Sequence, residues 1–314
     1  MNDPVIQIKG LSKSYGSVKA VDGLNLEIYK GEIFGLLGPN GAGKTTTILM
    51  MLGLTEPTGG SVHVCGYHST SNPIAVKRKV GYMPDSLGFY DQMSAMENLL
   101  YIARLNGLSE TQAMNKALEV METVGLSAEK HKKTGAYSRG MKQRLGLAEV
   151  LIKDPDVIIM DEPTLGIDPT GVKDFLSLIK SLSRDKGITV LLSSHHLHHV
   201  QQVCDRVGIF VKGKLLAQGN IDALSKDLFG HEGYVTSIKV AQEMPEQWSV
   251  KTELRQWDGL NKIKVDGKEI EATCSKDLTA ALVRYFVNAG YDVLGVHQKD
   301  YGLDEIYQKY FEAK

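Results

Sequence analysis

A glycine-rich segment near the N-terminus has the residue types and spacing that hold phosphate. It reads Gly38-Pro39-Asn40-Gly41-Ala42-Gly43-Lys44-Thr45 and lies between an apolar run over 33–37 and an apolar helical stretch that begins at Thr46. Glycines let backbone N–H groups turn towards phosphate oxygens, and the N-terminus of the following helix adds partial positive charge. The segment fits the pattern G-x-x-x-x-G-K-[ST] in its strand, loop and helix context. We therefore expect ATP phosphates here, with Lys44 on the β- and γ-phosphates and the Thr45 hydroxyl on Mg²⁺. A glycine-rich turn with a solvated lysine is the alternative.

Two carboxylates follow a second apolar run. Val157-Ile158-Ile159-Met160 predicts a buried strand, and Asp161 and Glu162 come directly after it. Ligands of open α/β sheets gather at the carboxyl ends of strands, so we expect Asp161 beside the loop as a Mg²⁺ partner, directly or through water. Glu162 is then placed to orient and deprotonate a water that attacks the γ-phosphate. Alone, an Asp-Glu-Pro turn says little; together with Lys44 it favours nucleotide hydrolysis over binding alone.

These groups need a sheet and helices to position them, and the apolar pattern predicts both. Apolar runs over 33–37, 157–160 and 189–192 predict buried strands that alternate with helical patterns, which is typical of an α/β sheet domain. Two capping boxes, beginning at Ser94 and Ser109, each start a stretch with helically spaced apolar residues. A helical subdomain is therefore predicted between strands.

The order of further motifs resembles the ATP-binding subunits of ATP-binding cassette (ABC) transporters over residues 5–220. Tyr15, in Leu11-Ser12-Lys13-Ser14-Tyr15-Gly16, matches the aromatic residue that stacks on adenine; a strand or core tyrosine is the alternative. Tyr137-Ser138-Arg139-Gly140-Met141-Lys142-Gln143-Arg144 is similar to the signature motif, in which Ser138 caps a helix whose N-terminus can hold an anion. The resemblance implies a P-loop NTPase cassette, with a mixed sheet and an inserted helical subdomain.

The same resemblance implies a two-subunit site. Asp168, in Leu165-Gly166-Ile167-Asp168, matches the loop that connects the two sites of a dimer, and His195 matches the switch histidine on the γ-phosphate. In the family, Ser138 and Gly140 of one subunit contact the γ-phosphate held by the other. A chain with one cradle and one signature therefore needs a second copy to complete a site. Catalytic roles for Glu162 and His195, ATP and Mg²⁺ as cofactors, and a separate transmembrane permease subunit follow from the resemblance.

Two positions depart from the family pattern. Asp85 stands where the family has a glutamine, after Gly81-Tyr82-Met83-Pro84. A carboxylate there can still reach Mg²⁺ through a water, so we expect Asp85 among the nucleotide and metal contacts. In the signature, Arg139 replaces the first glycine and Met141 the glutamine, a form that resembles the exporter branch of the family. The serine and the second glycine remain, and we expect a competent site.

Two clusters have competing interpretations. His195, His196, His198 and His199 lie at helical spacings that metal sites use, but we expect the last three to be solvated on a helix surface. After Asp85, the loop carries four apolar side chains that match the family groove for a permease helix: Leu87, Phe89, Tyr90 and Met93. The alternative is that they pack the helical subdomain.

Composition narrows the setting. The 314 residues are 42% hydrophobic, and Lys plus Arg at 36 against Asp plus Glu at 37 gives a net charge of −1, so no nucleic-acid-binding surface is expected. Apolar stretches fall short of the roughly 20 residues of a membrane span, and the start Met1-Asn2-Asp3-Pro4 lacks signal-peptide features. Three cysteines far apart fit a reducing compartment. We expect a cytoplasmic protein on the inner face of the cell membrane.

The chain is predicted to divide near Gln218-Gly219-Asn220, because every phosphate-type motif lies before that point. Residues 1–220 form the predicted ATP-binding domain and 221–314 a small α+β accessory or regulatory domain. In the tail we expect strands over 234–240, 262–265, 270–274 and 293–296, and a helix over 278–288. A last helix, over 302–311, resembles the terminal helix of exporter-type cassette ATPases.

The predicted function is ATP hydrolysis that drives substrate movement, with export the expected direction, by a separate transmembrane subunit. A soluble cassette protein acting on ribosomes or DNA is an alternative, disfavoured because the chain has one cassette and a short stretch between Thr45 and Ser138. An ATP-binding regulator without turnover is a third reading, supported only by Asp85.

Overall fold

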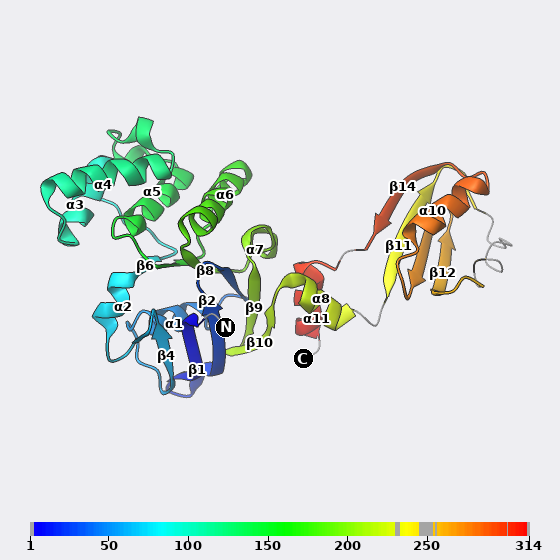
Figure 1. Ribbon diagram of the computed structural model, residues 1–314, viewed down its shortest axis with the longest axis horizontal. Helices are drawn as coiled ribbons and strands as arrows, with labels where there is room; N and C mark the ends of the chain where they lie inside the picture. The colour runs from blue at the N-terminus through cyan, green and yellow to red at the C-terminus, as the bar shows by residue number, and fades with distance from the viewer. Residues whose placement is uncertain (1–2, 230–232, 245–253, 255, 300, 313–314) are drawn as a thin grey trace. The chain divides into compact units, whose positions relative to one another are not determined.

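The computed structural model describes residues 3–229, 233–244, 254, 256–299 and 301–312. Met1 and Asn2, part of the start that was expected to lack signal-peptide features, lie outside the described residues. The chain divides into two compact units, Met1–Ile221 and Asp222–Lys314 (Figure 1). Unit 1 contains β1 (Pro4–Tyr15), β2 (Val18–Tyr29), β3 (Ile33–Leu37), α1 (Lys44–Met51), β4 (Gly59–Val64), β5 (Tyr67–His68), α2 (Pro73–Lys79), β6 (Val80–Met83), α3 (Ala95–Leu105), α4 (Glu110–Thr123), α5 (Arg139–Leu151), β7 (Val157–Asp161), α6 (Pro169–Lys186), β8 (Thr189–Ser194), α7 (Leu197–Val203), β9 (Arg206–Val211) and β10 (Lys214–Gly219).

A six-stranded sheet in the order β10-β9-β3-β8-β7-β6 carries the chemistry of unit 1. Its strands pair in parallel except for β10, which runs antiparallel to β9. Every residue of β3, β7 and β8 is buried, which explains why their sequences contain continuous apolar runs; β7 and β8 end in polar residues, Asp161 and Ser194. The predicted α/β fold class is confirmed. Because β6, β7, β8 and β3 are parallel neighbours, the segments after them emerge at one edge of the sheet.

A second, antiparallel sheet in the order β2-β1-β4-β5 packs over the first. One core joins the two sheets and α1: it includes Ile8 of β1, Phe34 of β3, Ile48 of α1, Ile159 of β7 and Leu191 of β8, each at most 1% exposed. This core fixes α1, and with it the loop that precedes α1, against the strand ends.

The predicted helical subdomain lies between β6 and β7 and consists of α3, α4 and α5. Both capping boxes are confirmed: Ser94 and Ser109 accept from the backbone N–H three residues on, and Glu97 and Gln112 reach back to the cap N–H. Figure 1 shows these helices grouped away from the antiparallel sheet of unit 1.

One helix boundary differs from the expected helix over 46–54. Helix α1 begins earlier, at Lys44, and ends at Met51. Gly43 has φ +106°, a conformation that glycine adopts readily, and it lets the loop turn directly into the helix. Gly53, at φ +61°, stands in the turn that closes the other end.

Unit 2 contains α8 (Ile221–Phe229), β11 (Tyr234–Val240), β12 (Leu260–Asp266), β13 (Glu269–Cys274), α10 (Thr279–Asn288), β14 (Val293–Gln298) and α11 (Leu303–Glu312). The strands form an antiparallel sheet in the order β12-β13-β11-β14, and α10 packs on it through Leu282 and Phe286, both fully buried. Phe229, the last residue of α8, stacks its ring on Tyr301 just before α11, at 4.0 Å between centroids, and Lys309 Nζ of α11 lies 5.9 Å from the centre of the Phe229 ring. The predicted tail strands and helices are confirmed, and their arrangement is a small α+β fold.

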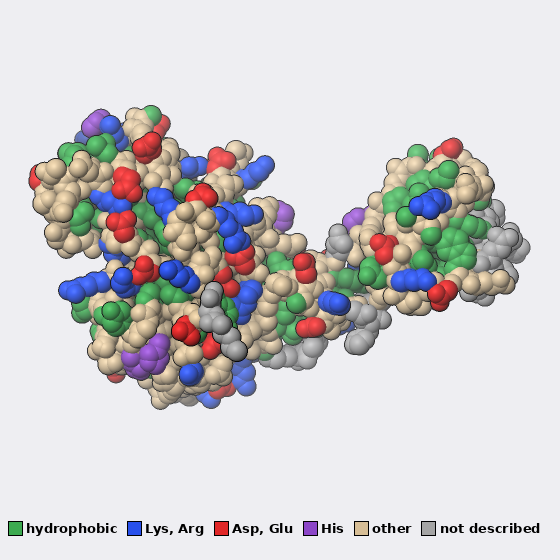
Figure 2. All heavy atoms as spheres, viewed as in Figure 1, with side chains coloured by type: hydrophobic (Ala, Val, Ile, Leu, Met, Phe, Trp, Pro, Cys, Tyr) green, Lys and Arg blue, Asp and Glu red, His purple; other side chains and the backbone are tan. Residues whose placement is uncertain are grey.

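Within the described residues, no helix combines the length and apolarity that crossing a bilayer requires. Cys65, Cys204 and Cys274 are free thiols, and burial raises the pKa of the Cys65 thiol to about 11. On the face of unit 1 drawn in Figure 2, acidic and basic side chains are interspersed and neither sign dominates.

Candidate active site

The glycine-rich loop connects β3 to α1 and can pack where it does only because it lacks side chains at two positions. A Cβ on Gly38 would lie 2.1 Å from the Phe210 carbonyl oxygen, and one on Gly43 would lie 2.3 Å from the Ala20 carbonyl oxygen. The loop is thus seated on β9 and on β2, with the N-terminus of α1 directly behind it.

A cavity of about 470 Å³ opens beside this loop. The segments after β6, β7 and β8 contribute the other polar walls, as parallel strand ends at one sheet edge predict. The cavity is lined by Ala20, Pro39, Asn40, Gly41, Ala42, Gly43, Lys44, Thr45, Thr46, Asp85, Asp161, Glu162, Leu165 and His195. The structure therefore brings together the loop, the carboxylates and the histidine that the sequence singled out; Gly38 contacts the site through its carbonyl group.

Lys44 is the buried cation of the cavity, with 5% of its surface exposed. Its Nζ donates to the carbonyl oxygens of Gly38 at 2.6 Å and Pro39 at 3.3 Å, and lies 3.4 Å from Oε1 of Glu162. A phosphate oxygen is a stronger partner for an ammonium group than a neutral carbonyl. The same side chain can therefore bind an anion in the cavity without leaving its place on α1.

Asp161 is held by two hydroxyl groups. Thr45 Oγ1 donates to Asp161 Oδ2 at 2.6 Å, and Ser193 Oγ donates to Asp161 Oδ1. Each donor keeps its oxygen lone pairs, and each carboxylate oxygen has more than one. Thr45 and Asp161 consequently present oxygen to the cavity while remaining bonded to each other. Ser193 was not among the predicted site residues; it reaches Asp161 as its register partner on the neighbouring strand, which the sequence of either strand alone does not indicate.

Glu162 and His195 form the second polar pair. Glu162 Oε2 lies 2.9 Å from His195 Nδ1, whereas Glu162 Oε1 is buried and has no hydrogen bond among the described residues. Glu162 is 9% exposed and has φ +48°, a left-handed conformation that is costly for a residue with a side chain. One carboxylate oxygen is thus fixed by the imidazole and the other is open for a further donor.

Asp85 is exposed and lies on the cavity wall, two residues after the end of β6. Nearby, Tyr82 has its pKa raised to about 12, first by burial and then by the negative charges of Asp161 and Asp85. Tyr82 therefore stays protonated at neutral pH. With Glu162, three carboxylates face a single lysine and a histidine.

The donor set suits a hard divalent cation bound together with phosphate. Hydroxyl and carboxylate oxygens are the ligands that Mg²⁺ prefers, usually one or two carboxylates completed by phosphate and water. Across the described part of the chain, no group of three His, Cys, Asp or Glu side chains is arranged to hold a metal by itself. Thr45, Asp161 and Asp85 thus fit Mg²⁺ as a partner of a bound nucleotide and not as a metal site on their own.

Four predicted nucleotide contacts lie away from this cavity. Ser138 caps α5, accepting from Met141 N at 3.2 Å, and Gly140 lies in the first turn of that helix. Asp168 caps α6 by accepting from Gly171 N at 3.0 Å. Tyr15 is the last residue of β1, as the strand alternative expects, and 51% of its surface is exposed, so it is not a core residue. None of the four lines the cavity.

The histidine cluster differs from the expectation of three solvated side chains. Only His198 is exposed; His196 and His199 are half-buried. His196 lies 4.0 Å from the His195 ring and 5.1 Å from the His199 ring, between centroids, and His199 Nδ1 is 3.0 Å from Thr164 Oγ1. Helix α7 begins only at Leu197, so His196 precedes the helix and its ring packs on that of His195 instead of lying on the helix surface.

The loop after Asp85 was expected either to form a groove for a permease helix or to pack the helical subdomain, and different residues of the loop fit each interpretation. Leu87 packs against α5, where a Cβ on Gly146 would come within 2.7 Å of it. Tyr90, by contrast, is 56% exposed and meets the exposed Tyr101 edge to face at 5.4 Å. Leu105, on the same helix as Tyr101, is 66% exposed. Part of the loop therefore packs the subdomain and part remains open.

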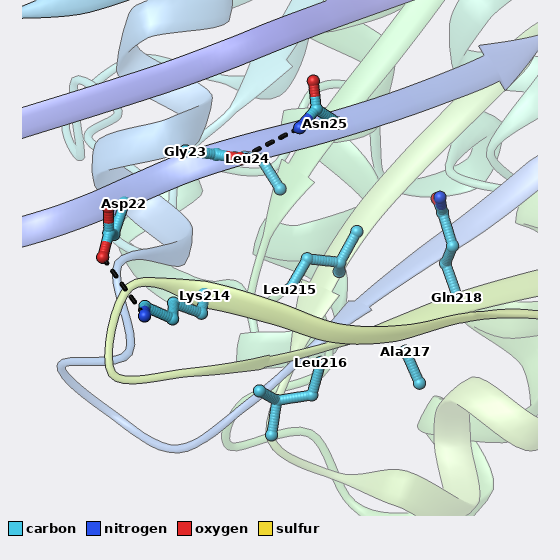
Figure 3. A pocket seen from close by; sticks show the side chains of 9 residues that line it. All are labelled: Asp22, Gly23, Leu24, Asn25, Lys214, Leu215, Leu216, Ala217 and Gln218. Carbon is cyan, nitrogen blue, oxygen red and sulfur yellow. Dashed lines mark hydrogen bonds and ion pairs between the residues drawn. The ribbon is translucent and has the colours of Figure 1, made fainter.

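A separate groove of about 500 Å³ lies between β2 and β10 (Figure 3). Its charged side chains, Asp22 and Lys214, face one another with Nζ to Oδ2 at 3.4 Å, and Asn25 donates to the carbonyl of Gly23. Because these polar groups are already paired, the groove offers far less to a phosphate than the loop of Lys44.

Comparison with known proteins gives a consistent result. The model of the family described as ABC transporter matches residues 21–165. The bacitracin transport ATP-binding protein BcrA of Bacillus licheniformis is 45% identical over 222 residues, 71% of this chain and 72% of that one. The uncharacterized ABC transporter ATP-binding protein YhcH of Bacillus subtilis (strain 168) is 37% identical over 284 residues, 90% and 88% of the two chains. Among solved structures, cbiO1 of Clostridium perfringens, part of the ABC transporter complex cbiONQ, superposes with a TM-score of 0.65 at 27% identity, covering 73% of this chain and 91% of that one.

Proposed function

The chain belongs to the ABC transporter family as an ATP-binding subunit, and from that premise we propose that it hydrolyses Mg²⁺-bound ATP to drive export through a separate membrane subunit. The observation that carries the proposal is the convergence of Lys44, Asp161, Glu162 and His195 on one cavity. These four residues come from three segments: the start of α1 and the ends of the neighbouring strands β7 and β8.

Binding follows from charge and geometry. The backbone N–H groups of the loop and the Lys44 ammonium group hold the β- and γ-phosphates, and the exposed ring of Tyr15 stacks on adenine. When bound, Mg²⁺ would neutralise phosphate charge between Thr45 and Asp161, with Asp85 reaching it through a water. The Thr45 hydroxyl keeps its hydrogen on Asp161, so its orientation is already set.

Hydrolysis is assigned to Glu162. Its Oε1 has no hydrogen bond among the described residues, although Lys44 Nζ lies 3.4 Å away. This oxygen accepts a proton from a water as the water oxygen bonds to the γ-phosphorus and the bond from that phosphorus to the β–γ bridging oxygen breaks, giving ADP and phosphate. His195 holds Oε2 at 2.9 Å and so directs Oε1. Nδ1 donates to this carboxylate, so the other ring nitrogen can donate to the γ-phosphate when both nitrogens of His195 carry a hydrogen.

A second copy is proposed to complete each site. Gly140 supports this, because its own chain does not require a glycine there: a Cβ would meet only Ile167 Cγ2, at an ordinary 3.5 Å. A glycine inside a helix costs about 1 kcal/mol relative to alanine. A close approach from outside the chain explains the residue, and the α5 N-terminus at Ser138 is suited to a partner's γ-phosphate. Asp168 then lies in the loop between the two sites.

The permease partner is proposed to bind the open aromatic surface formed by Tyr90, Tyr101 and Leu105. This places the subunit at the cytoplasmic face of the membrane. Export is supported by the Ser138-Arg139-Gly140-Met141 form of the signature and by BcrA, a bacitracin transport protein, as a relative. For unit 2 we propose an accessory role in the dimer.

Replacing Glu162 with Gln tests the proposal. We expect E162Q to bind ATP, to accumulate as a nucleotide-locked dimer and to lose at least about 100-fold in turnover, the scale of general-base catalysis. Glu119→Gln, on an exposed face of α4, is the matched control and retains wild-type turnover. Wild-type hydrolysis by E162Q contradicts the assignment of the base. Purification from membranes in mild detergent tests the partner: a polytopic subunit that co-purifies supports transport, and its absence favours the soluble alternative.

A further inference from the structure

The backbone of Glu162 is held in an unfavourable conformation at the point where chemistry is proposed. Its φ of +48° lies in the left-handed region, which costs a non-glycine residue on the order of 1–3 kcal/mol. Such a conformation persists only where surrounding contacts over-determine it. Which contacts do so therefore bears directly on how the carboxylate is aimed.

Two backbone hydrogen bonds flank Glu162. Its own N–H donates to the Ser193 carbonyl at 3.1 Å, and Leu165 N donates to the Glu162 carbonyl at 3.2 Å. The first ties the strand end to β8, and the second closes the turn after Glu162 on itself. Neither joins that turn to another element.

Two side chains join the turn to other elements: Arg139 on α5, whose Nε donates to the Leu165 carbonyl at 2.7 Å, and Thr164, which connects the turn to α7. Thr164 is 4% exposed, and its Oγ1 lies 3.0 Å from Nδ1 of His199 on α7. Helix α7 starts two residues after His195, whose ring binds the Glu162 carboxylate. The same two segments are thus joined twice, once at Glu162 and once at Thr164, and the His196 ring fills the space between His195 and His199.

The environment keeps this contact neutral. The pKa of His199 is lowered by burial and then by the neighbouring imidazoles of His196, His198 and His195, and the pKa of His196 is lowered by burial and by His195. A neutral imidazole bonds to a hydroxyl group without adding charge beside the phosphate site.

We propose that His199 is a positioning residue for ATP hydrolysis: through Thr164 it holds the turn after Glu162, and so keeps the Glu162 carboxylate between His195 and Lys44. The inference rests on the proposed role of Glu162 as general base. It assigns to His199 a task that the motif residues themselves do not perform.

A double-mutant cycle tests the contact. His199→Leu keeps volume and removes the bond, and Thr164→Val does the same from the other side. Each is expected to lower kcat about 10-fold while the Kd for ATP stays within about 2-fold, and the double variant is expected to be no worse than either single one, because both remove one interaction. His199→Asn places a polar atom where Nδ1 was and restores kcat to within about 3-fold of wild type.

His198→Leu is the matched control and is expected to retain wild-type kcat, since His198 is exposed and, within the described part of the chain, its hydrogen bond is to Gln202 on the same helix. Effects that multiply in the double variant, or an Asn variant as poor as the Leu variant, overturn the proposal. Amide hydrogen exchange over 163–167 is measured on the same proteins and is expected to quicken in H199L and T164V but not in H198L. If the wild-type protein fails to hydrolyse ATP, the proposed function falls, and unchanged exchange in H199L then refutes the positioning contact separately.

Discussion

Asp85→Asn removes one of three carboxylates from the phosphate cavity and replaces it with a neutral group of the same shape. Asp85, Asp161 and Glu162 together outnumber the single buried cation, Lys44. A cavity of this charge repels ATP that arrives without a metal, whereas Mg²⁺ brings the charge that the carboxylates attract. We therefore expect Asp85 to make nucleotide binding depend more strongly on Mg²⁺.

The size of the effect follows from the dimensions of the cavity. A volume of about 470 Å³ corresponds to a sphere of about 5 Å radius, so a wall carboxylate lies on the order of 7 Å from a bound phosphate. At that separation two unit charges interact by about 0.6 kcal/mol in water and about 2.4 kcal/mol at an effective dielectric constant of 20. Because Asp85 is exposed, the lower part of this range applies. We expect D85N to bind metal-free ATP about 3- to 10-fold more tightly than wild type.

The assay is equilibrium binding of ATP, in EDTA and in Mg²⁺, at one ionic strength so that screening is constant. D85N is expected to tighten the EDTA value and to leave the Mg²⁺ value within about 2-fold, which lowers the ratio of the two. Asp91→Asn is the control, since Asp91 is exposed, pairs with Lys142 and does not line the cavity. An unchanged ratio in D85N, or equal shifts in D85N and D91N, refutes the electrostatic reasoning.

Two further substitutions test how the site is built. Ser193→Ala removes one of the two hydroxyl donors to the buried Asp161 carboxylate. Because hydrogen bonds to charged groups contribute about 1.5–3 kcal/mol, we expect the free energy of unfolding, measured by urea titration, to fall by that amount. We also expect ATP binding to depend less strongly on Mg²⁺. Gly43→Ala places a Cβ 2.3 Å from the Ala20 carbonyl oxygen and 2.9 Å from the Phe210 ring at φ +106°, so we expect ATP binding to be lost in a filter assay; tight binding by that variant contradicts the packing described for the loop.

Local signals made much of the fold predictable. The strands β3, β7 and β8 are buried on both faces, so their apolar runs could be recognised without knowing their neighbours. The boxes at Ser94 and Ser109 could be read because both partners of each box lie within four residues. In the site, the residues of the loop and of the strand ends were predictable because parallel strands deliver them to one edge.

What escaped prediction depends on contacts between distant segments. Ser193 meets Asp161 only through the register of β8 beside β7, and Thr164 meets His199 only through the place of α7. The left-handed backbone conformation of Glu162 could not be predicted from the sequence, because position 162 is not a glycine, the residue that usually indicates such a conformation. His196, His198 and His199 were expected to be solvated on a helix surface, but α7 begins only after His196, and His199 is half-buried on α7 where it meets Thr164.

Arg139 occupies a position of the signature motif where the family has a glycine, and the structure shows where the larger side chain lies. Where the family has a glycine, Arg139 turns its side chain back, and its Nε donates to the Leu165 carbonyl at 2.7 Å. A Cβ on Gly166 would lie 2.8 Å from the same Nε, so the glycine at 166 makes room for the guanidinium group. The side chain is therefore held against the turn after Glu162 in its own chain, which supports the proposal that the capped N-terminus of α5, with Ser138 and Gly140, receives a partner's phosphate. Arg139 therefore adds a side-chain hydrogen bond between α5 and the turn after Glu162, the proposed base, which a glycine at position 139 could not make.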